Sequence, residues 1–72
     1  MMTSKYEIII YWSDEDDAYV ADAPELKGCM AHGGTYESAL ANIQSAMELW
    51  IETAKEFNDS IPEPKGRRLA FA

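Results

Sequence analysis

The sequence is poor in cysteine, histidine and basic residues. Its 72 residues include one cysteine, Cys29, one histidine, His32, and six lysines and arginines against 13 aspartates and glutamates. A single cysteine cannot form an intramolecular disulfide, which is typical of proteins that work in a reducing compartment. No stretch approaches the ~18 apolar residues that cross a bilayer, and the N-terminus lacks the pattern of a secretion signal. We therefore expect a soluble, cytoplasmic protein that does not contact membranes.

The negative charge is unevenly distributed along the chain. Residues 1–64 hold all 13 acidic groups and three lysines, which leaves a net charge of −10, whereas residues 65–72 hold three basic residues and no acid. A body with this charge repels nucleic-acid phosphates and attracts basic partners. We expect no direct binding of nucleic acid, and we expect Lys65, Arg67 and Arg68 to pair with acids of the chain or of a neighbouring subunit. A purely solubilising role of the charge is the alternative.

The length predicts a single domain, residues 1–72. A chain this short buries only about 60% of its unfolded surface, so its core is small and its stability low. Neither a disulfide nor an evident metal or cofactor site reinforces this core. We therefore expect self-association, as a dimer or tetramer, or binding to a partner, with a well-packed monomer as the alternative.

The spacing of apolar residues predicts one long amphipathic helix over residues 35–57. The spacing alternates between four and three, which places these residues on one face of a 3.6-residue repeat. Thr35 occupies the N-cap position, where its hydroxyl can accept a hydrogen bond from the first turn. Ser38 stands where a full capping box has Glu or Gln, so we expect an incomplete box. The predicted apolar face comprises Tyr36, Leu40, Ile43, Met47, Trp50, Ala54 and Phe57, widened by Ala39, Ala46 and Ile51.

Four short strands are predicted at residues 5–12, 18–23, 29–32 and 66–71. The first has β-branched and aromatic residues on both faces, which favours a central position in a sheet. The acidic run at 13–17 predicts a hairpin loop, and Pro24 and Gly28 end the second strand. The fold class is therefore α+β with the order β-β-β-α-β, in which the helix packs on one face of a small sheet. The last strand would run parallel to a neighbour, because a right-handed crossover precedes it.

Several short motifs follow one another in a specific order. The pair YEIII at 6–10 and AYVA at 18–21 is followed by PELKGCMA at 24–31. GTYESALANI at 34–43, ELWI at 48–51 and IPEP at 61–64 come next. In this order and spacing the motifs resemble the HicB family of antitoxins over residues 6–70. Lys27 stands where this family often has proline, and Ser38 stands where it often has glutamate.

The resemblance implies both a fold and a function. The fold would be a partly complete ribonuclease-H-like arrangement. The partner would be a small HicA toxin, which resembles a double-stranded-RNA-binding domain and cleaves mRNA with a histidine, and the antitoxin would cover that catalytic surface. Many HicB proteins continue into a DNA-binding domain that does not follow Ala72 here, so operator binding is not expected. An orphan domain acting through homo-oligomers or another protein partner is the alternative.

Enzymatic activity is not expected of this chain. Ribonuclease-H-type catalysis needs carboxylates from several elements that converge on two metal ions. Glu7 is the only carboxylate in the first predicted strand, whereas Glu48 and Glu52 lie on the polar side of the helix. A weak metal-dependent ribonuclease is therefore the less favoured alternative. Cys29 and His32 are three residues apart and face opposite sides of a strand, which favours a packed thiol and a histidine near the sheet edge.

The candidate partner-binding residues are acidic. Carboxylates would speed association with a basic partner, whereas apolar anchors would supply most of the affinity. The aromatic residues Tyr11, Trp12, Tyr19 and Tyr36 are candidate anchors, of which we expect at least half to lie in the core. The acidic run lacks the spacing of a calcium loop, so no metal site is predicted. The candidate acidic surface comprises Asp14, Glu15, Asp16, Asp17, Asp22 and Glu25.

Overall fold

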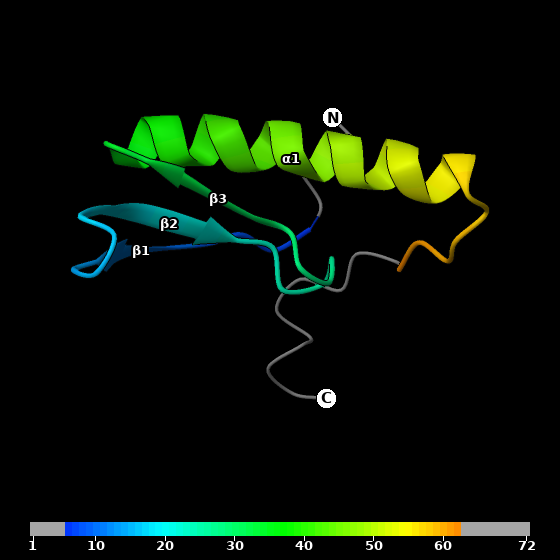
Figure 1. Ribbon diagram of the computed structural model, residues 1–72, viewed down its shortest axis with the longest axis horizontal. Coiled ribbons are helices and arrows are strands. Elements are labelled where there is room, and N and C mark those ends of the chain that lie inside the picture. Colours follow the sequence, from blue (N-terminus) through cyan, green and yellow to red (C-terminus); the bar gives the residue numbers. More distant parts are fainter. Residues whose placement is uncertain (1–5, 63–72) are drawn as a thin grey trace.

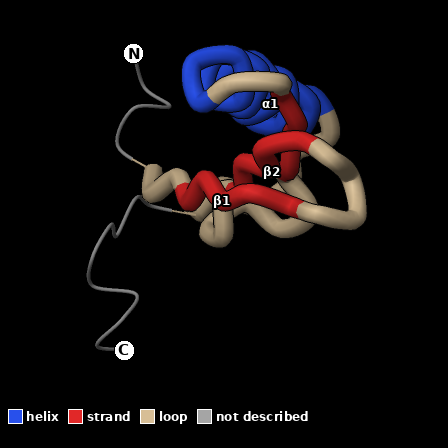
Figure 2. Tube along the Cα trace, turned by 90° about the vertical axis from the view of Figure 1, so that its left-hand side faces the viewer, coloured by secondary structure: helices blue, strands red, loops and turns tan. Residues whose placement is uncertain are grey.

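The computed structural model describes residues 6–62 and contains three strands and one helix. The elements are β1 (Ile9–Ser13), β2 (Ala18–Asp22), β3 (Met30–Gly33) and α1 (Tyr36–Glu56). The strands form an antiparallel sheet in the order β1-β2-β3, and α1 runs across one of its faces (Figure 1). Seen along the sheet, the described chain forms two layers, one helical and one of strands (Figure 2). The predicted α+β class is confirmed.

The predicted fourth strand, at residues 66–71, lies outside the described residues, so the parallel pairing and the right-handed crossover through α1 remain predictions. Within residues 6–62, β2 is the central strand and β1 pairs with β2 alone. A central position for β1 would need a partner on its other edge, so that prediction depends on the part of the chain not described. The first strand also begins at Ile9, later than the predicted residue 5.

The core lies between the sheet and α1. The sheet contributes small side chains such as Ala21, and the helix contributes the fully buried Ile43 and Met47. Small residues on the sheet allow the helix to approach closely, as dense packing requires. Leu26 fills one end of this layer from the β2–β3 connection, which backbone hydrogen bonds hold between residues 23 and 29. The buried face of α1 comprises Ala39, Ile43, Met47, Ile51 and Ala54.

The C-terminal end of α1 extends past the strands, whereas its first turn lies beside the β1–β2 hairpin (Figure 1). Tyr36 and Phe57, predicted on the apolar face, are 55% and 68% exposed, and Leu40 is 39% exposed. The 21 residues of α1 span about 31 Å at ~1.5 Å per residue, whereas a five-residue strand covers only about 17 Å. The helical period is therefore correct, but the sheet is too short to cover the whole apolar face.

The first turn of α1 is closed by a full capping box, so the prediction of an incomplete box is wrong. The Thr35 hydroxyl accepts a hydrogen bond from the Ser38 backbone N–H at 3.0 Å, and the Ser38 hydroxyl accepts one from the Thr35 N–H at 3.0 Å. The short serine side chain reaches the N-cap amide directly, so a longer Glu or Gln is unnecessary. Gly33 precedes this turn, and a Cβ there would lie 2.3 Å from the Ala39 nitrogen.

Candidate partner-binding surface

The six predicted acidic residues do not form one cluster. Asp14 to Asp17 form the exposed connection between β1 and β2, whereas Asp22 ends β2 and Glu25 lies in the next connection. At ~3.3 Å per residue, Asp22 lies about 13 Å along the strand from the loop end of β2. We call residues 14–17 the acidic hairpin loop, and this loop is separate from the other two carboxylates.

Asp22 and Glu25 are more enclosed than the loop residues. The Glu25 carboxylate accepts a hydrogen bond from the Glu7 backbone N–H at 3.1 Å, which joins the β2–β3 connection to the chain that enters β1. Asp22 is half-buried and lies opposite Ile9 and Met30 in the strand register. Glu25 therefore has a structural contact in addition to its predicted role in binding.

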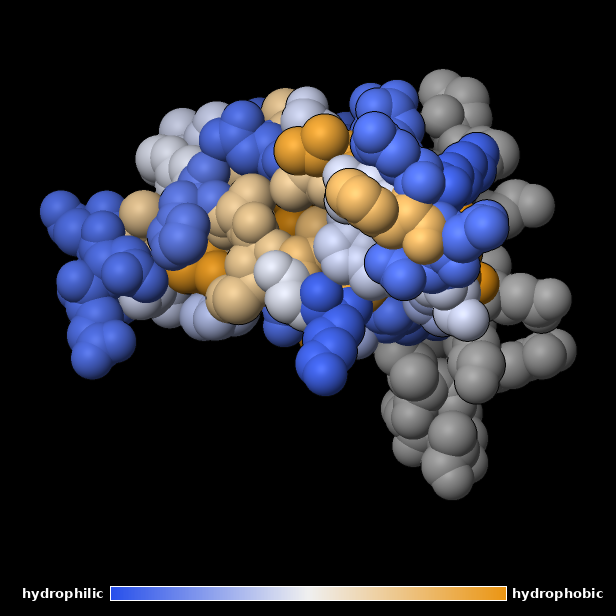
Figure 3. Space-filling model, turned by 45° about the vertical axis from the view of Figure 1, so that its right-hand side comes forward, coloured by the Kyte–Doolittle hydropathy of each residue, from blue (hydrophilic) through white to orange (hydrophobic). Residues whose placement is uncertain are grey.

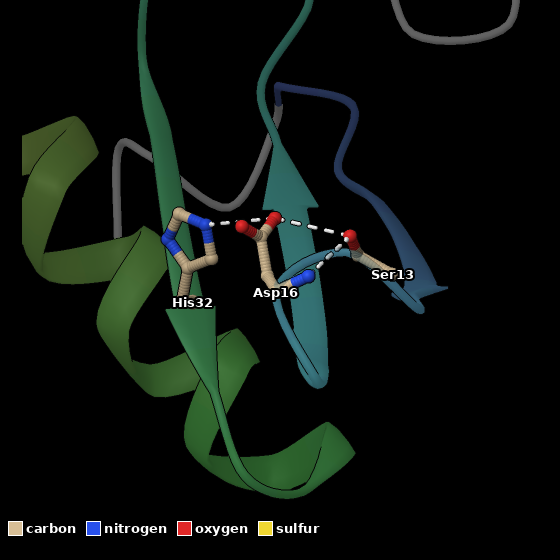
Figure 4. A network of polar contacts seen from close by, with 3 residues as sticks. All are labelled: Ser13, Asp16 and His32. Atoms are coloured by element: carbon tan, nitrogen blue, oxygen red, sulfur yellow. Dashed lines mark hydrogen bonds and ion pairs between the residues drawn. The ribbon is translucent and has the colours of Figure 1, made fainter.

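The acidic hairpin loop is held by a small polar network (Figure 4). The Ser13 hydroxyl donates to the Asp16 carboxylate at 3.0 Å and accepts from the Asp16 backbone N–H at 3.2 Å. The His32 Nε2 of β3 lies 3.6 Å from the same carboxylate. A nucleophilic triad places histidine between serine and the carboxylate, whereas here the carboxylate lies between the other two. The network therefore orders the loop, and its geometry is not that of an activated serine.

Three aromatic side chains stack at the same end of the molecule. The rings of Trp12 and Tyr19 are 5.1 Å apart at 75°, and those of Tyr19 and Tyr36 are 4.4 Å apart at 31°. The Trp12 indole donates to the Asp14 carboxylate at 2.8 Å. We call Trp12, Tyr19 and Tyr36 the aromatic cluster.

The cluster is more exposed than the sequence predicted. Trp12 and Tyr36 are 47% and 55% exposed, and Tyr11, on the other face of the sheet, is 45% exposed. Only Tyr19 of the four candidate anchors packs against the core. The expectation that at least half of them are buried is therefore wrong, because Trp12 and Tyr36 lie where the hairpin and α1 reach past the packed layer.

A second apolar surface lies toward the other end of α1. A groove of about 460 Å³ runs between the start of β3 and the C-terminal half of the helix. Leu49 in this groove is 65% exposed, and the Trp50 indole donates to the Lys27 carbonyl at 3.0 Å. Figure 3 shows apolar side chains in the middle of one face, with hydrophilic ones toward the hairpin end at left. The lining includes Met30, Ala46, Leu49, Trp50, Thr53 and Ala54.

Cys29 and His32 lie as predicted. Cys29 is 5% exposed and belongs to the core, and His32 lies on the edge strand β3, on the face away from α1. Burial, and secondarily the Asp22 carboxylate, raise the pKa of the Cys29 thiol. The protonated thiol is a poor nucleophile, so Cys29 acts as a small hydrophobic residue.

Other kinds of site have no support within residues 6–62. In that range no three His, Cys, Asp or Glu side chains are grouped so that they could hold a metal ion. The one helix in that range, α1, is too polar to cross a membrane. The basic residues Lys65, Arg67 and Arg68 lie outside the described range. Exposed carboxylates and aromatic rings are therefore the chemistry that the described surface offers.

Comparison with known proteins places the chain in a family. The sequence pattern described as "HicB-like antitoxin of bacterial toxin-antitoxin system" matches residues 6–68. A UPF0150 protein of Thermoplasma acidophilum is 40% identical over 65 residues, which cover 90% of this chain and 93% of the relative. Another from Synechocystis is 40% identical over 57 residues, 79% of this chain and 77% of the relative. No solved structure matches significantly. The chain belongs to the HicB-like antitoxin family of bacterial toxin–antitoxin systems.

Proposed function

We propose that this protein is the antitoxin of a type II toxin–antitoxin pair and binds a small, basic, HicA-like toxin that cleaves mRNA. Family membership supports the antitoxin role, and the charge of the surface supports the basic partner. Within residues 6–62 there are 12 acidic residues against two lysines, which leaves a net charge of −10. This role would place the protein in the cytoplasm, where mRNA is translated.

The proposed mechanism is steric occlusion. A toxin that binds RNA must present cations to the phosphates, and these cations would be attracted to the acidic hairpin loop. The loop carboxylates would replace the phosphates as counter-charge while the body of the domain covers the toxin's catalytic histidine. The observation that carries the proposal is the exposure of all four loop carboxylates, Asp14 to Asp17, on an ordered hairpin. Asp22 and Glu25 would contribute from the other end of the hairpin through their longer-range field.

The test begins with the native partner. The tagged chain is used to isolate bound proteins from a lysate of the source cells, and small basic proteins are identified by mass spectrometry. Each candidate is then purified alone and assayed for RNA cleavage with increasing amounts of this chain. We expect cleavage to stop near an equal molar ratio. A partner whose cleavage continues at a large excess of this chain would overturn the proposal.

Self-association is a second property that the surface supports. Ile9 and Tyr11 are each nearly half exposed on the side of the sheet away from α1. Apolar residues gathered on one face are typical of surfaces that contact another protein. We propose that the chain forms a dimer or tetramer, which light scattering after size-exclusion chromatography would measure. An orphan domain would show this assembly without inhibiting any toxin.

The described residues offer no metal-binding group in support of the ribonuclease alternative.

A further inference from the structure

We propose that the aromatic cluster of Trp12, Tyr19 and Tyr36 is the surface that binds arginine and lysine side chains of the basic partner. This inference rests on the proposed function and names the contact surface for it. The β1–β2 hairpin and the start of α1 lie at the same end of the molecule (Figure 1), so the cluster joins three elements. It therefore forms one continuous surface although its residues come from distant parts of the sequence.

Contacts within this chain hold the three rings of the cluster together. Tyr19 packs against the core and against both other rings, at 5.1 Å and 4.4 Å. The bond from the Trp12 indole to Asp14 fixes the outer ring on the hairpin side. Aromatic residues held in place lose little conformational entropy on binding, which is one reason why they dominate the energetics of interfaces. Exposed rings with this degree of order are therefore good anchors.

The charge around the cluster selects the partner. The Asp14 carboxylate accepts the bond from the Trp12 indole and Glu37 follows Tyr36 in the first turn of α1, whereas the Asp16 carboxylate of the same loop lies against His32. Aromatic faces attract guanidinium and ammonium groups, and carboxylates bind the same groups through charge-assisted hydrogen bonds. A site with both aromatic faces and carboxylates favours binding of a basic peptide segment and disfavours binding of an acidic protein or a nucleic acid.

The groove beside Leu49 is the rival surface, and its charge is less selective. Lys27 and Lys55 are the only lysines or arginines within residues 6–62. The Lys27 carbonyl accepts the bond from Trp50 in the groove, and Lys55 lies in the last turn of α1. Both cations therefore lie toward the groove end of the molecule, away from the aromatic cluster. A basic partner would meet both lysines near the groove, whereas no lysine or arginine of residues 6–62 lies at the cluster end.

A fluorescence titration tests the chemistry of the cluster directly. The Trp50→Phe variant retains Trp12 as its only tryptophan, and Trp12→Phe retains Trp50. The probe is an octa-arginine peptide, and a peptide with citrulline in place of arginine is its neutral control. We expect the fluorescence of Trp12 to change saturably as the arginine peptide is added, and the fluorescence of Trp50 to change little. Adding Tyr36→Ala to the Trp12-only protein should weaken the affinity for the peptide by about fivefold or more. The proposal is overturned if Tyr36→Ala leaves the affinity within twofold. If Trp50→Phe does not fold, calorimetry on the wild type and Tyr36→Ala makes the same comparison.

Inhibition of the isolated toxin tests the surface in its biological setting. Tyr36 and Leu49 are both well exposed, so neither Tyr36→Ala nor Leu49→Ala should unfold the protein, as circular dichroism can verify. We expect Tyr36→Ala to need about tenfold more protein for half-inhibition, and Leu49→Ala to match the wild type. If Leu49→Ala weakens inhibition and Tyr36→Ala does not, the contact lies in the groove. That result would overturn this inference, while the antitoxin function would stand. If the wild type inhibits no toxin, the proposed function fails, and the peptide titration still decides whether the cluster binds cations.

Discussion

At the scale of single residues, the two adjacent glycines before α1 have different requirements. A Cβ on Gly33 would lie 2.3 Å from a backbone nitrogen and 2.4 Å from the Ser38 hydroxyl, whereas a Cβ on Gly34 would meet nothing within 4 Å. A backbone atom cannot move aside as a flexible side chain can. Gly33 is therefore needed for the close approach between the end of β3 and the first helical turn.

We expect Gly33→Ala to lower the free energy of unfolding by about 1–3 kcal/mol, because overpacking forces the strand and helix apart. Gly34→Ala is the matched control and should change it by less than about 0.5 kcal/mol. Urea unfolding followed by circular dichroism measures both values. Equal effects of the two substitutions would contradict the assignment of the clash to Gly33.

The buried thiol of Cys29 predicts a pH dependence of stability. Its pKa is raised above the ordinary value of 9.0, first by burial and then by Asp22, so the folded state holds this proton more tightly than the unfolded chain does. The associated stabilisation is fully present below pH 9 and is lost as the pH rises toward the folded pKa. We expect the free energy of unfolding to fall more between pH 8 and pH 10.5 in the wild type than in Cys29→Ala. Urea unfolding at these pH values measures the difference, and parallel curves would contradict it.

At the scale of elements, α1 has a well-defined beginning and extends past the strands at its C-terminal end. The capping box fixes its first turn, and the Asn42 side chain donates to the His32 carbonyl at 2.7 Å, which joins α1 to the edge strand β3. Hydrogen bonds of this kind fix the position of the helix along the sheet. They therefore also determine where Tyr36 meets the hairpin.

The capping box gives a prediction about the helix. Thr35→Ala removes the acceptor for the Ser38 amide and should destabilise the protein by about 1 kcal/mol, whereas Thr35→Ser should stay close to the wild type. Ser38→Ala removes the reciprocal bond, and because the two bonds share residues the double variant should lose less than the sum. Urea unfolding of the four variants gives the coupling free energy between the two hydrogen bonds. Strict additivity would show that the two bonds act independently.

At the scale of the whole molecule, two apolar surfaces lie toward opposite ends of the long axis, and lysines lie near only one of them. The acidic hairpin loop and the aromatic cluster occupy one end, while the groove and both lysines of residues 6–62 lie toward the other. Exposed carboxylates lie at both ends, and the lysines offset part of that charge only at the groove end, so the field that a basic protein meets differs between the two ends. The location of the acidic residues, and not only their number, should therefore matter.

The effect of where the charge lies can be tested by comparing two variants in which different sets of four acidic residues are neutralised. We expect neutralisation of the four loop residues by Asn or Gln to slow association with the isolated toxin by about tenfold at low salt and to flatten its salt dependence. Neutralising four other exposed acids leaves the same net charge and should have a smaller effect. Stopped-flow mixing at several salt concentrations measures the rates, and equal slowing would show that net charge alone acts. The control sites are Glu48, Glu52, Glu56 and Asp59.

Short-range patterns in the sequence predict the helix and its N-cap, the acidic hairpin, the three described strands and the acidic character. These follow from short-range rules, because helical and strand periods are set by backbone geometry and net charge is a count. The motif order also pointed to the HicB family, which the family match confirms. Residues 66–71 and a ribonuclease-H-like arrangement remain predictions.

Only the tertiary structure decided which predicted features lie on the surface. Trp12, near the hairpin end of β1, and Tyr36, in the first turn of α1, are exposed because they lie where the packed layer ends, and the sequence gives no signal for where packing ends. Ser38 completes the capping box, and Glu25 binds the Glu7 backbone, through distances that depend on the folded path of the chain. The aromatic cluster likewise exists because β1, β2 and α1 meet at one end. Periodicity specifies each element, whereas exposure and contact depend on the length and position of its neighbours.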